Sequence, residues 1–282
     1  MENLRVHPPV EGNWHKEEDA TYLIALDIDG TLVKHDGTMN DAVKETVQQV
    51  MNAGHHVIIS TGRSRQAAHP IAQMLGLDKG FMVTSNGAVT YVLSPAYEDG
   101  LRVFDCVHFN PTRALKLLSE KVPYAQMAVE VPSGEIYATA DFEDGNFGST
   151  AIRVNKEELF TMNEATRVVL FAENVDQDEF QQAIYHAGLH GVNYSVGWSA
   201  WLDIAAHGVS KASALEHLRR KLGVDPAHTI AIGDGHNDKE MIHWAARGVA
   251  MGEAPDEVIK VAKEVTLSVY EDGVAHTLQS LL

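Results

Sequence analysis

The chain of 282 residues has an ordinary globular composition but a strongly acidic charge balance. Hydrophobic residues make up 45% and charged residues 22%, which excludes a disordered or fibrous chain, and at roughly 150 residues per domain the length predicts about two domains. The 22 Lys and Arg face 39 Asp and Glu, for a net charge of −17. Because nucleic acids and anionic lipids are bound by clustered Lys and Arg, we expect neither nucleic acid nor membrane as a partner.

Cysteine usage and the N-terminal residues narrow the class of protein further. The single cysteine, Cys106, excludes an internal disulfide framework and a Cys-cluster zinc site, and it fits a reducing, cytoplasmic location. The start of the chain lacks the apolar stretch of a secretory signal, and no run approaches the length of a membrane span. Residues 1–20 are polar, and we interpret them as an N-terminal tail outside the fold.

The first ordered part of the chain alternates strands and helices. The apolar run 22–26 is typical of a central parallel strand, and 56–59 and 81–84 predict two more strands. A helix after Asn40 and a helix through 71–75 lie between them. This alternation predicts a doubly wound, Rossmann-like α/β sheet.

The pattern changes near residue 88 and returns near residue 203. Between these positions strands are predicted at 89–93, 125–131, 135–139 and 167–172, with helices near 111–121 and 177–187. After them, α/β alternation resumes with helices near 210–222, 238–246 and 256–262, strands at 229–232 and 249–250, and a last helical turn or two. We therefore predict an α/β core of residues 21–87 and 203–282, interrupted by an inserted α+β unit of residues 88–202.

Polar residues follow four of the predicted core strands at the point where each strand ends. Asp27 and Asp29 follow the first strand, Thr61 the second, Asn86 the third and Asp234 the strand near the C-terminus. In open α/β sheets, ligands bind beyond the carboxyl ends of the strands. The agreement among four strands predicts a binding site at this edge.

The acidic residues at this edge have two interpretations. Asp27 and Asp29 are two residues apart, so their side chains point the same way in an extended chain, and two close carboxylates repel unless a proton or cation is shared. A solvated turn explains Asp-x-Asp-Gly as well as a magnesium site does. Asp234 offers a further carboxylate, although its segment alone is more often a turn and helix cap.

Thr61, Gly62 and Lys211 are candidate anion-binding residues. A hydroxyl and a glycine amide at a helix start can hold a phosphate, although a simple helix cap is the alternative. Lys211 lies near a helix start, where its charge opposes the helix dipole, which indicates that the ammonium faces a negative group. A solvated surface lysine is the alternative.

Taken together, the motifs resemble those of the haloacid dehalogenase-like (HAD) phosphohydrolases. The four matching motifs, in chain order, are Asp27-Ile28-Asp29-Gly30-Thr31, Thr61-Gly62-Arg63, Lys211 and Gly233-Asp234-x-x-Asn237-Asp238. Asn86-Gly87-Ala88 and the insertion after it resemble the Cof-type subfamily (subfamily IIB), whose cap domain determines substrate specificity. The resemblance covers about residues 22–282.

The resemblance implies a role for each motif residue. Asp27 would be the nucleophile that forms an aspartyl-phosphate, and Asp29 would be the general acid and base. Mg²⁺ would be bound by the carboxylates of Asp27 and Asp234 and the backbone carbonyl of Asp29. Asp238 would support the metal site or Lys211, and the phosphate oxygens would be bound by the Ile28 amide, Thr61, Gly62, Lys211 and Asn237.

We therefore expect a Mg²⁺-dependent phosphatase of a small phosphorylated metabolite, with a sugar phosphate as the expected substrate, in a monomer or small homo-oligomer. A phosphomutase of the same fold and a catalytically silent regulatory protein that binds a phosphometabolite are the alternatives. Within the cap, the aromatic candidates could contact the substrate or pack in the core, and the charged candidates could contact the substrate or be solvated. The candidates are the aromatic residues Tyr194, Trp198 and Trp201, the acidic residues Glu130, Glu135, Asp141 and Glu143, and Arg153 and Arg167 as binders of a second phosphate.

Overall fold

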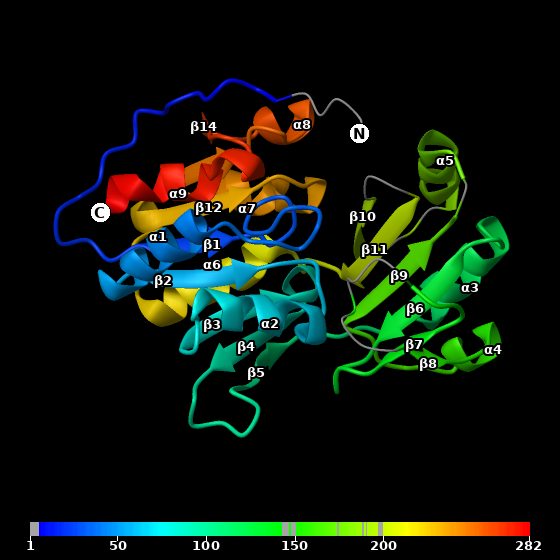
Figure 1. The fold of residues 1–282 in the computed structure, drawn as a ribbon. Coiled ribbons are helices and arrows are strands. Elements are labelled where there is room, and N and C mark those ends of the chain that lie inside the picture. The colour runs from blue at the N-terminus through cyan, green and yellow to red at the C-terminus, as the bar shows by residue number, and fades with distance from the viewer. Residues whose placement is uncertain are drawn as a thin grey trace.

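The computed structural model describes residues 6–142, 147, 151–173, 175–187, 189, 191–196 and 200–282. Within these residues the strands form one sheet of eight strands and one of six, which belong to two units that lie side by side (Figure 1). Glu143 and Trp198, two of the candidate substrate contacts, lie outside the described residues.

The larger sheet has the strand order β14-β13-β12-β1-β2-β3-β4-β5. Its parallel strands are β1 (Leu23–Leu26), β2 (His56–Ser60), β3 (Gly80–Thr84), β12 (Thr229–Gly233), β13 (Arg247–Ala250) and β14 (Glu264–Val265). The strand β1 lies between β12 and β2, with Leu23 opposite both Thr229 and His56. The predicted doubly wound α/β core is confirmed.

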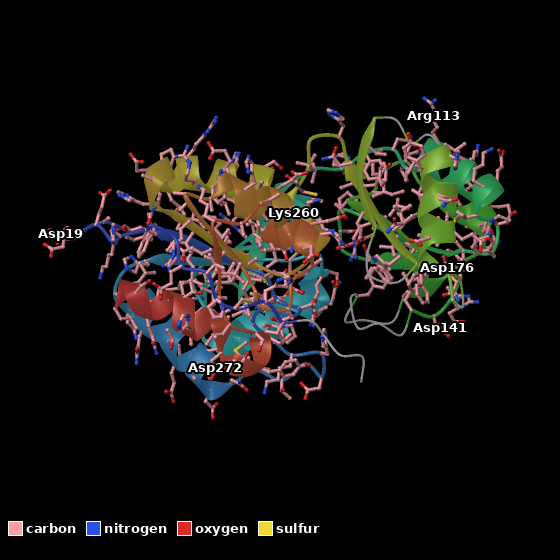
Figure 2. All side chains as sticks on the ribbon, turned by 90° about the horizontal axis from the view of Figure 1, so that it is seen from above. Asp19, Arg113, Asp141, Asp176, Lys260 and Asp272 are labelled. Atoms are coloured by element: carbon pink, nitrogen blue, oxygen red, sulfur yellow. The ribbon has the colours of Figure 1, made fainter. Side chains whose placement is uncertain are left out.

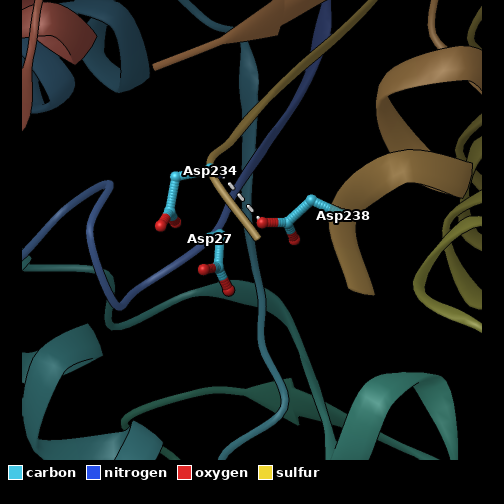
Figure 3. A group of neighbouring side chains, drawn as sticks. All are labelled: Asp27, Asp234 and Asp238. Atoms are coloured by element: carbon cyan, nitrogen blue, oxygen red, sulfur yellow. Dashed lines mark hydrogen bonds between the residues drawn. The ribbon is translucent and has the colours of Figure 1, made fainter. Parts of the chain in front are cut away.

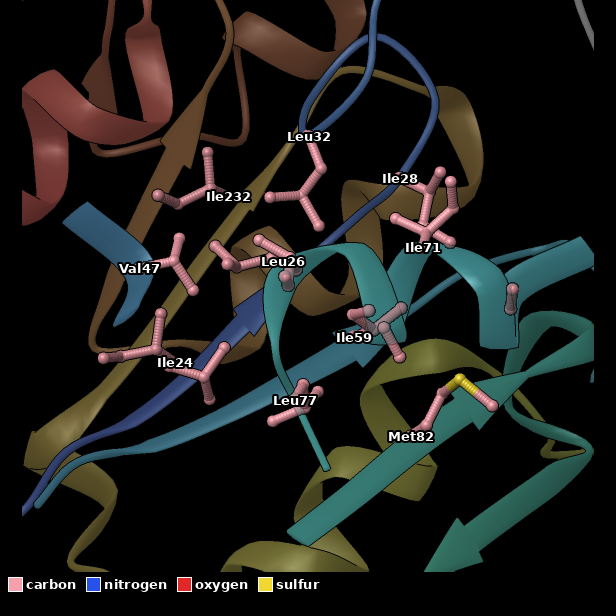
Figure 4. Packing of buried hydrophobic residues seen from close by; sticks show 14 of the residues in the cluster. Ile24, Leu26, Ile28, Leu32, Val47, Ile59, Ile71, Leu77, Met82 and Ile232 are labelled. Atoms are coloured by element: carbon pink, nitrogen blue, oxygen red, sulfur yellow. The ribbon is translucent and has the colours of Figure 1, made fainter. Parts of the chain in front are cut away.

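Helices cover both faces of this sheet. Because successive strand residues point to opposite faces, Ile24 and Leu26 pack in one apolar layer, and Leu23 and Ala25 pack in the other. The first layer, shown in Figure 4, lies against α1 (Asp41–Asn52), α2 (Arg65–Leu75) and α9 (Gly273–Leu278). The second lies against α6 (Lys211–Leu222) and α7 (Lys239–Trp244), and the short α8 (Asp256–Ile259) packs beside α7. Burial on both faces fixes the position of the strand ends.

The smaller sheet has the order β10-β11-β9-β6-β7-β8 and helices on one face. Its strands are β6 (Gln126–Glu130), β7 (Ile136–Ala138), β8 (Ile152–Arg153), β9 (Arg167–Phe171), β10 (Val192–Val196) and β11 (Trp201–Ala206), and its helices are α3 (Thr112–Lys121), α4 (Lys156–Leu159) and α5 (Gln177–Ala187). Met127 and Val129 pack under the helices. The next residue, Glu130, points to the opposite face of the sheet and accepts a hydrogen bond from Ser85 of the larger unit. The helix-free face of this sheet therefore lies toward the larger unit (Figure 1).

No described helix combines the length and the apolar character that crossing a bilayer requires.

The strand at 89–93, assigned from the sequence to the inserted unit, belongs instead to the larger sheet. It is β4 (Val89–Leu93), which pairs antiparallel with β3 and then with β5 (Leu101–Cys106), a strand that was not predicted. A tight turn at Ser85–Gly87 joins β3 to β4, and all three of its residues have positive φ. Alternating apolar residues predict a strand but not the sheet that it joins. The division into domains stays a prediction.

The N-terminal segment also differs from the sequence-based expectation of a tail outside the fold. The backbone of Val10 pairs with that of Val265, and the Arg247 guanidinium lies 4.3 Å from the centre of the Trp14 ring. The Lys16 ammonium donates a hydrogen bond to the Leu281 carbonyl at 2.6 Å. Residues 6–20 therefore pack along the C-terminal part of the larger unit (Figure 1).

Candidate active site

The structure brings the polar residues that follow the central strands to one edge of the larger sheet. Asp27 directly follows β1, Thr61 follows β2 and Asp234 follows β12, and these three strands are neighbours and parallel. The Asp27 N–H donates to the Ile232 carbonyl at 3.1 Å, so the ladder continues past the end of β1. The carboxyl ends of parallel strands meet at one edge, which is why the strand pattern predicted this location.

Three carboxylates form a compact cluster at this edge (Figure 3). Asp27, Asp234 and Asp238 each offer an oxygen, and these oxygens lie within 4.8 Å of one another. Asp238 is fully buried, and its Oδ2 accepts the backbone N–H groups of Asp234 at 3.0 Å and Gly235 at 2.8 Å. The turn after β12 therefore fixes the Asp238 carboxylate beside the other two.

Lys211 is the cation of the cluster. It is the first residue of α6, after the capping residue Ser210, and its side chain is fully buried. Its ammonium donates to Asp27 Oδ1 at 2.7 Å and to Asp238 Oδ1 at 2.6 Å. Burial disfavours the charge, but the two carboxylates outweigh burial and raise the pKa of Lys211. The negative partners of Lys211 in this structure are thus two residues of the chain.

The cluster carries more negative than positive charge. When all three carboxylates are ionised, they and the one ammonium leave two uncompensated negative charges. Burial, and next the repulsion from Asp238, raise the pKa of Asp27 to about 7, although Lys211 opposes this shift. Burial and the carboxylates of Asp238 and Asp27 also raise the pKa of Asp234 well above its usual value. Hard oxygen donors with two uncompensated charges fit a divalent cation such as Mg²⁺.

Asp29 lies apart from this cluster. Its side chain is 54% exposed, and both carboxylate oxygens accept hydrogen bonds from Arg63, at 2.9 Å from Nε and 2.5 Å from Nη2. The expectation that Asp27 and Asp29 point the same way required an extended chain. Here the chain turns at once, because the N–H groups of Leu32 and Val33 both donate to the Ile28 carbonyl at 2.9 Å.

Gly30 gives this turn room beside the cluster. Its φ of +72° is in the left-handed region, and a Cβ atom there would lie 2.4 Å from Asp234 Oδ2. The next residue, Thr31, donates from Oγ1 to Asp234 Oδ1 at 3.3 Å. The turn after β1 and the turn after β12 are therefore in direct contact.

The candidate phosphate-binding residues on the other side of Asp27 also lie close together. Thr61 is buried, and its Oγ1 accepts the Arg63 N–H at 3.1 Å. A Cβ atom on Gly62 would lie 3.0 Å from Asn86 Oδ1 and 3.3 Å from Asn237 Nδ2. Asn237 donates to Asn86 at 2.9 Å. The absence of a side chain on Gly62 keeps the space between its backbone and this amide pair open.

The turn after β3 brings this amide pair to the start of α6. Asn86 has a φ of 54° and Gly87 a φ of 100°. A Cβ atom on Gly87 would lie 2.2 Å from the Ser210 carbonyl oxygen, so only glycine permits this approach. The Asn86-Gly87 sequence is a turn signal, but its contact with the start of α6 could not be read from local sequence.

A cavity of about 350 Å³ lies between the two units and reaches Lys211. The larger unit contributes Asn86, Asn237 and Lys211 to its lining, and the smaller unit contributes Tyr194 and Asp203 among others. Small-molecule sites are typically concave and mix apolar surface with a few polar groups. The location and size of this cavity fit a small ligand.

The candidate substrate contacts of the smaller unit fall into two groups. Tyr194 is 44% exposed and lines the cavity, whereas Trp201 packs among the rings of Phe142, Phe147 and Phe171. Trp201 is therefore a packing residue.

The charged candidates separate in the same way. Glu130 is buried and accepts the Ser85 hydroxyl at 2.9 Å, a contact between the two units that the sequence did not indicate. Arg167 is buried in an ion pair with Asp203. The remaining candidates lie on the surface and outside the cavity lining, with Glu135 bonded to Ser133, and Arg153 3.7 Å from Asp141.

Comparison with known proteins agrees with this fold and site. A sequence model of haloacid dehalogenase-like hydrolases matches residues 24–278, and the chain belongs to this family. It is 29% identical to 5-amino-6-(5-phospho-D-ribitylamino)uracil phosphatase YitU of Bacillus subtilis, over 93% of this chain and 98% of that protein. It is 31% identical to the putative phosphatase YkrA of the same organism, over 92% of this chain and 97% of that protein.

A solved structure shows the same fold. The HAD subclass IIB sugar phosphatase BT4131 superposes with a TM-score of 0.77, at 23% identity, over 93% of this chain and 99% of that chain. The resemblance to the haloacid dehalogenase-like family is thus confirmed by the family model, and the likeness to BT4131 shows the shared fold. The chain is a hydrolase of the HAD family, and its curated relatives are named as phosphatases.

Proposed function

We propose that this chain is a Mg²⁺-dependent phosphomonoester hydrolase that acts through an aspartyl-phosphate on a small phosphorylated metabolite, a sugar phosphate. The observation that carries this proposal is the environment of Asp27. Its carboxylate lies at the end of the central strand, bonded to Lys211 and within a buried cluster with two uncompensated negative charges. The cavity that reaches Lys211 gives a small ligand access from the side of the smaller unit.

The substrate class is supported by cavity size and by one relative. The cavity, of about 350 Å³, suits a small metabolite. The name of the relative YitU specifies a phosphate on a ribityl chain, which is a hydroxylated carbon chain like that of a sugar. A sugar phosphate combines the same two chemical groups.

The proposed metal donors are the carboxylates of Asp27 and Asp234 and the backbone carbonyl of Asp29. Bound Mg²⁺ would supply positive charge that balances the cluster and the oxygens of the transferred phosphoryl group. Asp238 would keep Lys211 in place through the 2.6 Å hydrogen bond. The two uncompensated charges of the cluster support this assignment.

The proposed reaction has two steps. The Asp27 carboxylate attacks phosphorus, the bond from phosphorus to the leaving oxygen breaks, and Asp29 gives that oxygen a proton. In the second step Asp29 takes a proton from water, the water oxygen attacks phosphorus, and the bond to Asp27 breaks to release phosphate. Arg63 holds the Asp29 carboxylate in this structure, so the proton transfers require Asp29 to leave this pair.

Backbone and side-chain donors beside Asp27 would hold the phosphoryl oxygens. Fixed donors stabilise the charge that develops in the transition state without reorganisation. Gly62 leaves its backbone approachable, and Asn237 and Lys211 lie on the cavity side. The proposed donors are the Ile28 and Gly62 amides, the Thr61 hydroxyl, Lys211 and Asn237.

The function is tested by a screen of about a hundred phosphate monoesters with Mg²⁺ and with a chelator. We expect phosphate release that requires Mg²⁺ and is absent in Asp27→Asn. Isomer exchange without phosphate release would replace the proposal with a phosphomutase. Tight binding of one phosphometabolite without turnover of any ester would replace it with a regulatory protein.

A further inference from the structure

The cavity between the two units has a charge distribution that bears on substrate choice. We infer that it takes an uncharged, hydroxyl-bearing leaving group and discriminates against substrates with a second phosphate or a carboxylate, and that the Asp203–Arg167 pair sets this selectivity. The inference rests on the proposed phosphatase function. It goes beyond that function because it specifies which of two classes of phosphate ester the cavity accepts.

Arg167 is a cation in the cavity lining, but its charge is already balanced. Its side chain is only 2% exposed, and its Nε donates to Asp203 Oδ1. The guanidinium carbon lies 5.4 Å from the centre of the Phe147 ring and 5.9 Å from that of Trp201. These contacts hold the guanidinium in place, so moving it to a second phosphate would leave Asp203, whose side chain is only 15% exposed, without its cation.

Asp203 is itself fixed. Its Oδ2 accepts the indole N–H of Trp201 at 2.9 Å, while Oδ1 accepts from Arg167. A second carboxylate, that of Glu130, is fully buried nearby and interacts electrostatically with both Arg167 and Asp203. The Asp203 carboxylate thus balances the Arg167 guanidinium, and this wall of the cavity has no surplus positive charge.

The remaining lining supports the same conclusion. Lys211 is bonded to Asp27 and Asp238, and Glu240 adds another carboxylate to the lining. Among the described residues of the lining, Arg167 is the only arginine and Lys211 is the only lysine. The segments 143–146, 148–150 and 197–199, which lie outside the described residues, contain neither arginine nor lysine.

The rest of the lining is uncharged or paired. His236 lies 3.5 Å from Glu257. Apolar and amide side chains, together with the exposed ring of Tyr194, suit the carbon face and hydroxyls of a sugar or polyol. The apolar and amide residues of the lining are Asn86, Val192, Asn193, Ile204, Ala205, Val209 and Asn237.

The test compares matched pairs of substrates that differ by one anionic group. The pairs are glucose 6-phosphate with glucose 1,6-bisphosphate, and glycerol 3-phosphate with 3-phosphoglycerate, with p-nitrophenyl phosphate as a general phosphatase substrate. In each pair, we expect kcat/KM to be at least tenfold higher for the substrate with a single anionic group, which corresponds to about 1.4 kcal/mol. Equal values, or a preference for the doubly anionic member, would overturn the inference while leaving the phosphatase function intact. Failure to hydrolyse any of the esters, p-nitrophenyl phosphate included, would overturn both.

Variants test the part assigned to Asp203. Asp203→Asn removes the countercharge of Arg167, so we expect the selectivity ratio to fall at least threefold. A purely structural role would lower kcat/KM for both members equally and leave the ratio unchanged, which would refute the assignment. Glu240→Gln changes an exposed residue of the lining, so it should lower the selectivity ratio as well, without destabilising the protein. The control is Asp141→Asn, a 94% exposed side chain of the smaller unit (Figure 2) outside the cavity lining, which should keep the wild-type ratio.

Discussion

The substitution Asp27→Asn should abolish catalysis and, at high pH, make the metal-free protein more stable. It keeps the shape of the side chain and removes one of the charges of the buried cluster. The pKa of Asp27 rises from 3.8 to about 7 in the folded protein, chiefly because of burial and secondly because of Asp238. The folded state therefore keeps this proton to higher pH than the unfolded state does, and metal-free stability falls as pH rises from about 4 to 7.

The magnitude follows from the size of the shift. A displacement of about three pKa units is worth on the order of 4 kcal/mol above pH 7. The pKa of about 7 already includes the attraction of Lys211, so this figure is the net cost of the Asp27 charge, which asparagine avoids. We therefore expect metal-free Asp27→Asn to be more stable than wild type by about 4 kcal/mol at pH 8, and to have no such advantage at pH 4.

Urea unfolding in the presence of a chelator, at pH 4 and at pH 8, measures this difference. Turnover of any substrate should fall by roughly 10⁴-fold or more in the same variant, since the nucleophile is gone. Asp141→Asn serves as the control, because its side chain is 94% exposed and belongs to the smaller unit (Figure 2), whereas the cluster lies in the larger one. If Asp27→Asn shows the same stability difference from wild type at both pH values, the assigned electrostatics of the cluster are wrong.

Three further predictions concern the same cluster. Mg²⁺ should raise the melting temperature more at pH 8 than at pH 5, because binding requires carboxylates that burial keeps protonated at low pH, and equal shifts in differential scanning fluorimetry would contradict this. Asp238→Asn should destabilise the protein by about 3 kcal/mol in urea unfolding, because an amide cannot replace both oxygens of Asp238, one of which accepts from the buried Lys211 and the other from the N–H groups of Asp234 and Gly235; a loss below about 1 kcal/mol would contradict this. Gly30→Ala should weaken Mg²⁺ binding measured by calorimetry, because the new Cβ would lie 2.4 Å from Asp234 Oδ2, and unchanged affinity would place the metal elsewhere.

The edge of the sheet that carries the site was predictable because it depends on local pattern and on a general rule of topology. Buried runs such as 22–26 and 229–232 predict parallel strands, and the residues that follow parallel strands meet at one edge. The position of Lys211 at a helix start also indicated that its charge has negative neighbours. Local sequence therefore sufficed to place Asp27, Thr61 and Asp234 at one edge, whereas the resemblance to the HAD proteins was needed to add Lys211 to the site.

Features that depend on contacts between distant segments could not be predicted in this way. The pairing of Val10 with Val265 joins two ends of the chain, and the polar residues 6–20 show no periodic pattern that indicates packing. The direction of Asp29 depends on the turn at Gly30 and on Arg63, more than thirty positions further along the chain. The contact of Ser85 with Glu130 depends on how the two units pack.

In the proposed reaction, Asp27 becomes phosphorylated during turnover. The most direct test is to denature the protein during turnover of a substrate found in the screen, reduce any acyl phosphate with borohydride and identify the modified residue by peptide mass spectrometry. We expect conversion of Asp27 to homoserine in wild type and no conversion in the Asp27→Asn variant. Turnover that leaves Asp27 unmodified, or reduction at a different carboxylate, would contradict the proposed reaction.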